Sequence, residues 1–192
     1  MKMSQQGKIS TEKMVLGALL TALVMVLQLM GASIKFGAFS ISLVLIPIVI
    51  GAATCGKSIG AWLGFIFGLA VLISGDAATF MAVSIPGTII TVLVKGTLAG
   101  FLAGLTYQFF AKYNKIVAVI LAAIVCPVVN TGIFLIGCLL FFLETVTAWA
   151  GGSNVGKYMI VGLVGINFLF ELGINIVLSP VIVRILNARQ KQ

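Results

Sequence analysis

The chain has 192 residues, of which 61% are hydrophobic and 8% are charged, whereas ordinary soluble domains contain about 25% charged residues. The mean hydropathy is +1.25, and a soluble fold cannot hide that much apolar surface, whereas a bilayer solvates it. This composition excludes a soluble globular domain. The formal net charge of +8 comes from bases at the ends of apolar runs, where the positive-inside rule explains them better than nucleic-acid binding.

Apolar runs separated by short polar connections predict an all-α integral membrane bundle. A membrane span needs about 20 residues, so we expect one domain, 1–192, of six transmembrane helices. The first apolar run is longer than the core of a secretory signal and no small-residue cleavage site follows it, so we expect a retained first helix. The predicted spans cover 13–33, 41–54, 59–74, 88–111, 116–143 and 158–186.

The basic residues predict how these spans are oriented. Six spans place both termini on one side, and that side carries nine of the twelve bases. Cytoplasmic loops are enriched in Lys and Arg, so we expect both termini in the cytoplasm of a multi-pass cell-membrane protein. Loops 35–40, 75–87 and 144–157 then face outside, and we expect Asp76 and Glu144 to be solvated there. The nine bases are Lys2, Lys8, Lys13, Lys57, Lys112, Lys115, Arg184, Arg189 and Lys191.

Small residues recur at every fourth position in three of the spans. This spacing puts them on one helix face and lets two helix backbones approach closely. In the first span Ala18 and Ala22 form such a face, with Gly17 and Thr21 beside them. The sequence alone leaves open whether that face packs inside the chain or against a partner. The two glycine stripes are Gly56, Gly60, Gly64, Gly68 and Gly96, Gly100, Gly104.

Residues 51–58 match the P-loop pattern letter for letter, but their context argues against nucleotide binding. A P-loop needs a preceding strand, a following helix and an acidic residue for magnesium, whereas apolar spans flank this segment. We interpret it as a cytoplasmic turn that carries Lys57. The chain has no histidine, and Cys55, Cys126 and Cys138 have no metal-ligand spacing, so we expect free thiols with packing roles and no metal site.

Polar residues inside the predicted spans indicate a solute site. An ionisable group there costs on the order of 2.5–3.5 kcal/mol on insertion scales. Lys95 shares a helix face with Thr91, and Glu171 shares one with two asparagines. At about 1.5 Å per residue, most of these groups lie within roughly 10–20 Å of the outer surface and are expected to meet in one cavity. The predicted substrate-binding residues are Lys95, Asn130, Asn167, Glu171, Thr91 and Asn175.

Two interpretations of these groups remain open at this point. In one, Lys95 pairs with a ligand carboxylate, the asparagines supply donors and acceptors, and Glu171 orients Lys95 or accepts from a hydroxyl. In the other, Lys95 and Glu171 form a buried ion pair and the asparagines join helices. With four acidic residues and no histidine, no catalytic residues are predicted, which disfavours a small membrane enzyme.

Several stretches, taken in order, resemble the substrate-binding S component of energy-coupling factor (ECF) vitamin transporters. The stretch 18–22, Ala-Leu-Leu-Thr-Ala, matches the family's Ala-xxx-Ala motif. Residues 41–47 and 60–68 look like its second and third helices. The stretches Val94-Lys95-Gly96 and Asn130-Thr131-Gly132 look like parts of its fourth and fifth helices, and most resemble the pantothenate-type members.

The resemblance implies a six-helix fold with an outward-facing vitamin site that the outer loops close. It implies one transmembrane coupling subunit and two ATPase subunits as partners, contacted through Ala18 and Ala22. ATP is then used by the partner subunits, no cofactor binds this chain, and the loaded S component topples in the membrane to deliver the vitamin. Riboflavin or another vitamin remains an alternative substrate, and a self-sufficient secondary transporter remains an alternative function.

Overall fold

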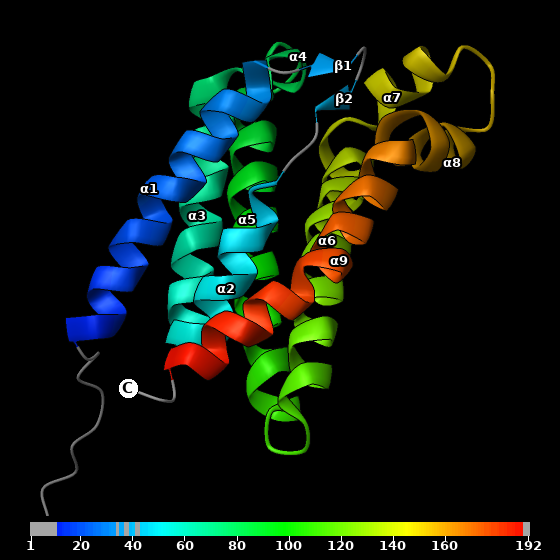
Figure 1. Cartoon of the computed structure of the whole chain (residues 1–192). Helices are drawn as coiled ribbons and strands as arrows, with labels where there is room; N and C mark the ends of the chain where they lie inside the picture. Colours follow the sequence, from blue (N-terminus) through cyan, green and yellow to red (C-terminus); the bar gives the residue numbers. More distant parts are fainter. Residues whose placement is uncertain (1–10, 34, 37–38, 41–42, 190–192) are drawn as a thin grey trace, which may run out of the picture.

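The computed structural model describes residues 11–33, 35–36, 39–40 and 43–189, which form a helical bundle with a short strand pair at one end (Figure 1). The strands β1 (Lys35–Phe36) and β2 (Phe39–Ser40) pair antiparallel where a loop was predicted. The helices are α1 (Thr11–Ser33), α2 (Leu45–Cys55), α3 (Lys57–Ser74), α4 (Ala78–Met81), α5 (Ile85–Phe110), α6 (Lys115–Phe141), α7 (Leu143–Ala150), α8 (Val155–Lys157), the π-helix η1 (Tyr158–Val164) and α9 (Gly165–Arg189).

Five helices, α1, α3, α5, α6 and α9, are long and apolar enough to cross a membrane. The helix α2 has 11 residues, or about 16 Å at 1.5 Å per residue, which is short of a hydrocarbon core of about 30 Å. The described residues therefore contain five full-length candidate spans, one fewer than predicted. The first part of the predicted second span, 41–42, lies outside the described residues.

Several predicted boundaries differ from the observed ones for local reasons. The loops predicted at 75–87 and 144–157 contain the short helices α4, α7 and α8. The helix α5 begins at Ile85, because the Oγ of Ser84 accepts a hydrogen bond from the Gly87 amide at 3.3 Å and caps the first turn. The predicted sixth span is two elements, η1 and α9, which meet at Gly165 with φ +39°, a conformation that glycine adopts without a steric cost.

The long helices run back and forth between two ends of the bundle. The helix α1 begins and α9 ends at the same end, which we call the terminal end (Figure 1). The strand pair, α4, α7 and α8 lie at the opposite end, which we call the α4 end. The turn between α5 and α6, with Lys112 and Lys115, is at the terminal end, whereas Lys157 belongs to α8 at the α4 end. The arrangement of these bases agrees with the predicted asymmetry.

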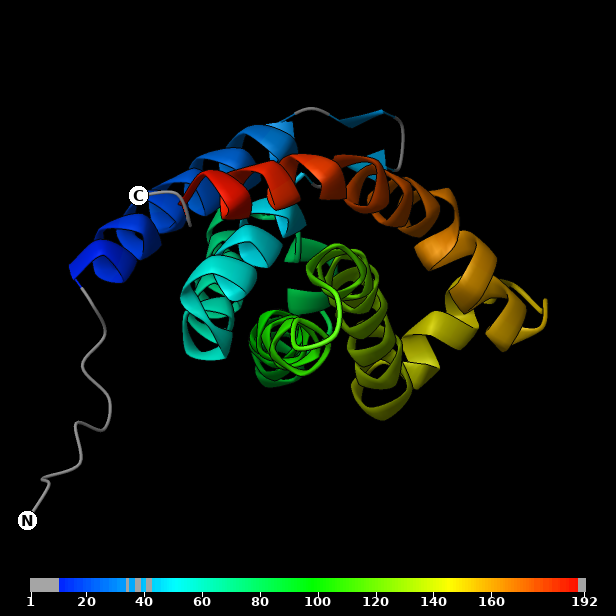
Figure 2. The ribbon, with the colours of Figure 1, turned by 60° about the horizontal axis from the view of Figure 1, so that its bottom comes forward.

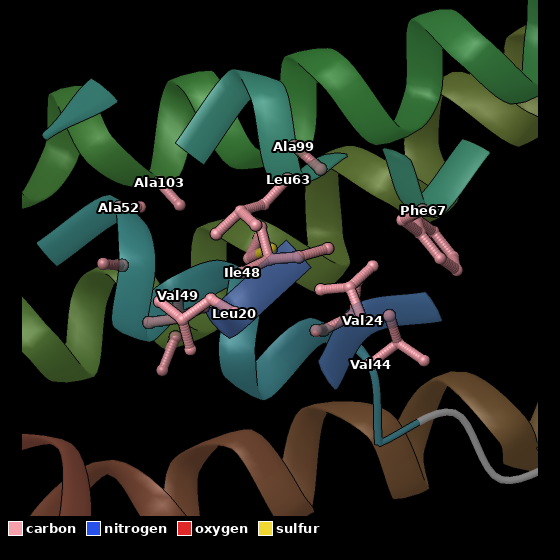
Figure 3. Close-up of a cluster of buried hydrophobic side chains, with 14 of the residues drawn as sticks. Leu20, Val24, Val44, Ile48, Val49, Ala52, Leu63, Phe67, Ala99 and Ala103 are labelled. Carbon is pink, nitrogen blue, oxygen red and sulfur yellow. The ribbon is translucent and has the colours of Figure 1, made fainter. Parts of the chain in front are cut away.

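An apolar core joins α1, α2, α3 and α5 (Figure 3). The short helix α2 is buried along most of its length because it is enclosed by neighbouring helices, and α1 lies at the edge of the bundle (Figure 2). The three cysteines are free thiols as predicted, and Cys126 and Cys138 are buried. The core side chains include Leu20, Val24, Ile48, Val49, Leu63, Phe67, Ala99 and Ala103.

The two glycine stripes bring α3 and α5 into backbone contact, as predicted. A Cβ added at Gly64 would overlap the carbonyl oxygen of Gly96, and one added at Gly60 would lie 2.5 Å from that of Gly100. Gly56 is an exception because it lies between α2 and α3 with φ +103° and belongs to neither helix. The P-loop-like residues 51–55 lie inside the helix α2, so their geometry is not that of a P-loop.

Replacing Gly64 with alanine is expected to destabilise the protein by about 1–3 kcal/mol, the usual cost of overpacking. The added methyl group would force α3 and α5 apart, since it meets backbone rather than a mobile side chain. Thermal unfolding in detergent measures the effect. Gly173→Ala is the matched control, because its Cβ meets no heavy atom within 4 Å. A Gly64→Ala protein as stable as this control would contradict the close-packing interpretation.

Candidate functional site

A cavity of about 220 Å³ lies among α1, α3, α5, α6, η1 and α9, beside the segment that connects α3 to α4. Its position next to α4 places it towards the α4 end of the bundle. Polar side chains and aromatic rings both contribute to its wall. The lining residues are Gln28, Phe67, Val71, Asp76, Ala77, Phe80, Thr88, Thr91, Val92, Lys95, Asn130, Thr131, Phe134, Phe142, Leu163, Val164, Asn167, Phe168 and Glu171.

Five of the six predicted site residues line this one cavity, although they come from three helices. They are Thr91 and Lys95 of α5, Asn130 of α6, and Asn167 and Glu171 of α9. Asn175 is not among the lining residues. It is buried one turn further along α9, and its Nδ2 donates to the backbone oxygen of Glu171 at 2.8 Å. Asn175 therefore contacts the site through the backbone of α9.

Local structure explains how these side chains reach the cavity. Thr91 and Lys95 are four residues apart on α5 and share a face. Asn130 follows Pro127, which lies inside α6 and removes one backbone donor from that helix. Asn167 lies in the first turn of α9, directly after the break at Gly165, and Glu171 is one turn later. The break is thus adjacent to the asparagine that enters the cavity.

The ammonium group of Lys95 faces aromatic rings and has no carboxylate partner among the described residues. Its Nζ lies 5.8 Å from the ring centre of Phe67 and 5.4 Å from that of Phe134, within the range of cation–π attraction. Glu171 lines the same cavity and is 6% exposed, yet no ion pair joins it to Lys95. The geometry does not match the alternative interpretation of a direct buried ion pair.

Three lining side chains also carry buried oxygen atoms without a hydrogen-bond partner. They are the Oγ1 of Thr91, the Oδ1 of Asn130 and the Oδ1 of Asn167. A buried polar atom left unpaired costs about 1–3 kcal/mol. Their grouping around one cavity, together with Lys95 and Glu171, indicates a site that a polar solute would complete.

Four polar residues that line the cavity were not among the predicted site residues: Gln28, Asp76, Thr88 and Thr131. Gln28 of α1 is 5% exposed and lines the cavity, and its Nε2 donates to the Oδ2 of Asp76. The expectation that Asp76 is a solvated loop end is wrong, because Asp76 is half-buried and lines the cavity as well. Gln28 could have been predicted as a site residue from the sequence, because it is a polar amide within the first apolar run. Glu144, by contrast, is exposed on α7 as expected.

An aromatic cluster contributes to the cavity wall at the α4 end. Phe80 of α4 lines the cavity and packs against Phe134, Phe142 and Trp149, with ring centres 5.5, 5.1 and 5.6 Å apart. These contacts join α4 to α6 and α7. Phe134 also lies beside the Lys95 ammonium, so the same ring contacts both the aromatic cluster and the polar part of the cavity.

The small residues of α1 point in two directions. Thr21 accepts a hydrogen bond at its Oγ1 from the indole of Trp62 in α3 at 3.2 Å, and Gly17 faces Ile59 of the same helix. Ala18 and Ala22 lie on the exposed side of α1. The Ala-xxx-Ala face is therefore not used for packing within the chain and remains accessible to lipid or to a partner.

Helices long and apolar enough to span a membrane, packed around a cavity with polar and aromatic lining, define an integral membrane protein. The model of the family "ECF transporter, substrate-specific component" matches residues 12–183, which is most of the chain, and the chain belongs to this family. It is therefore a transporter subunit, and membership implies a small-molecule substrate and an ECF module of coupling and ATPase subunits. Comparison with curated proteins and with solved structures finds no match.

Proposed function

We propose that this chain captures pantothenate at the outer face of the membrane and delivers it through an ATP-driven ECF module. The observation that carries the proposal is the unpaired Lys95 ammonium, which lines one cavity together with several unpaired oxygen atoms. A charge of this kind in an apolar surrounding is stabilised most by an opposite charge at hydrogen-bond distance. A ligand carboxylate supplies that charge.

The other polar groups fit the rest of the same ligand. Pantothenate has a carboxylate, an amide and two hydroxyl groups. Asn130, Asn167 and Thr91 can each donate or accept a hydrogen bond, and the Glu171 carboxylate can accept one from a hydroxyl or an amide N–H. In this arrangement the ligand separates Lys95 from Glu171 and satisfies both.

The size of the cavity supports a compact ligand. Sites for drug-sized molecules have volumes of about 300–1,000 Å³, and this cavity, at about 220 Å³, is below that range. The flexible, chain-like pantothenate suits this volume better than riboflavin, whose fused three-ring system is rigid and larger. Aromatic rings on the wall, such as Phe67 and Phe134, offer apolar contact to the ligand's methyl groups.

The proposed orientation puts the terminal end in the cytoplasm. The bases Lys57, Lys112 and Lys115 at that end support this orientation through the positive-inside rule. The α4 end and the cavity then face outside, where a scavenged vitamin arrives. We propose that α2, enclosed by the bundle, acts as a short sixth span, which gives the even number of passes that places both termini on one side.

Native mass spectrometry of the detergent-purified protein tests the substrate. We expect a bound mass equal to that of pantothenate. Exhaustive dialysis should remove this mass, and addition of pantothenate should restore it. A different vitamin recovered in stoichiometric amount would replace pantothenate in this proposal.

Uptake of labelled pantothenate by cells that express this chain with and without coupling and ATPase subunits tests the mechanism, and uptake without those partners would favour a secondary transporter.

A further inference from the structure

The hydrogen-bonded pair of Gln28 and Asp76 lies in the cavity wall without a role in the site described so far. Gln28 comes from α1 and is 5% exposed, and Asp76 follows Gly75 at the end of α3. The Nε2 of Gln28 donates to the Oδ2 of Asp76, and both residues line the same cavity as Lys95. The helix α1 and the segment after α3, which are distant in sequence, thus contact each other through this hydrogen bond in the cavity wall.

The chemistry of this pair is that of an acceptor. An ionised carboxylate offers about four lone-pair positions and no proton, and the Gln28 amide occupies one of them. The side-chain carbonyl of Gln28 adds a further acceptor. A ligand group that satisfies this pair must carry a hydrogen to donate, as a hydroxyl, an amide N–H or an ammonium does, whereas a ligand carboxylate would be repelled.

The pair also lies at a different depth from Lys95. Asp76 lies two residues before α4, at the α4 end, whereas Lys95 is about 15 Å along α5 from Ile85 at 1.5 Å per residue. The cavity therefore has an acceptor group at its α4 end and a cationic group further along α5. A ligand with a carboxylate at one end and hydroxyls at the other meets both groups in only one orientation.

We propose that Gln28 and Asp76 form an outer subsite that accepts hydrogen bonds from the hydroxyl end of the ligand while Lys95 holds its carboxylate. This inference rests on the proposed function, since it concerns the ligand of that same cavity. Asp76 contacts the hydroxyl groups directly. Gln28 is a positioning residue, because its amide fixes the orientation of the Asp76 carboxylate.

The test compares the affinities of the full-length purified protein for pantothenate and for an analogue in which hydrogen replaces both hydroxyl groups. Isothermal titration gives the ratio of the two dissociation constants. We expect the wild type to prefer pantothenate by about tenfold or more, as a hydrogen bond to a charged group implies. Asp76→Ala should bring the ratio close to one, and Gln28→Leu should lower it, while affinity for the analogue is kept.

The matched control is Glu144→Ala, which removes another acid at the α4 end that is exposed and does not line the cavity. This variant should keep the wild-type ratio. Asp76→Asn serves if Asp76→Ala is poorly folded, since it keeps the side-chain shape and removes the charge. An unchanged ratio, or an equal loss of affinity for both compounds, would overturn the subsite and leave the capture proposal standing. A wild type that binds neither compound would instead overturn the proposed substrate, and the subsite with it.

Discussion

Replacing Lys95 with methionine is expected to weaken binding of pantothenate by about 2–5 kcal/mol, the usual effect of truncating one partner of a buried charge pair. This range corresponds to about thirtyfold to several thousandfold in the dissociation constant. Methionine keeps an unbranched, apolar side chain beside Phe67 and Phe134, the two rings that lie near the Nζ. The loss should therefore come from the missing charge and not from a collapsed cavity.

The matched control for this variant is Lys157→Met. Lys157 is exposed on α8 at the α4 end and does not line the cavity, so its replacement removes a positive charge from the same end of the molecule. Titration of both variants with pantothenate shows whether the loss of affinity comes from a direct contact with Lys95 or from the lower positive charge of the protein as a whole. Equal affinities of the Lys95→Met protein and this control would remove Lys95 from the site.

The double replacement Ala18→Trp with Ala22→Trp is expected to prevent co-purification with the coupling and ATPase subunits while ligand binding persists. Small residues at this spacing let two helix backbones approach closely, and two indole rings would hold them apart. Both alanines lie on the exposed side of α1, so the change should not disturb the bundle. Recovery of partners in a pull-down should fall at least about tenfold, since a loss of 1.4 kcal/mol already has this effect.

A second exposed pair provides the control for this experiment. Val177 and Val181 are four residues apart on α9 and are 74% and 49% exposed. Their joint replacement with tryptophan adds the same bulk to another membrane-facing helix. We expect the control to retain both partners and ligand. If both double variants lost the partners alike, the effect would be general to the membrane surface, and α1 would have no special role.

The sequence predicted the helical bundle and most of its close packing because these depend on local patterns. Apolar runs define α1, α3, α5 and α6, and the four-residue glycine spacing predicted close helix packing, although only the structure shows that Gly64 meets Gly96. The same periodicity placed Thr91 with Lys95 and Asn167 with Glu171. A charged side chain within a membrane span is costly, and for this reason Lys95 and Glu171 were predicted as site residues. Both line the cavity.

The missed features depend on contacts between segments distant in sequence. The hydrogen bond between Gln28 and Asp76 joins α1 to the segment after α3, and no local pattern encodes that pairing. The break at Gly165 was missed because the apolar run continues through it, although the chain there adopts a left-handed φ. Asn175 shares the periodicity of Asn167 and Glu171, but it lies one turn beyond the lining residues of α9, because a face of a long helix extends further than the cavity.

A structure of this protein determined with its co-purifying solute would show whether the solute binds at Lys95. We expect solute density in the cavity among α5, α6 and α9, with a carboxylate at hydrogen-bond distance from the Nζ of Lys95 and with the oxygen atoms of Asn130 and Asn167 paired. A solute bound elsewhere, with Lys95 joined directly to Glu171 across a closed cavity, would contradict this expectation.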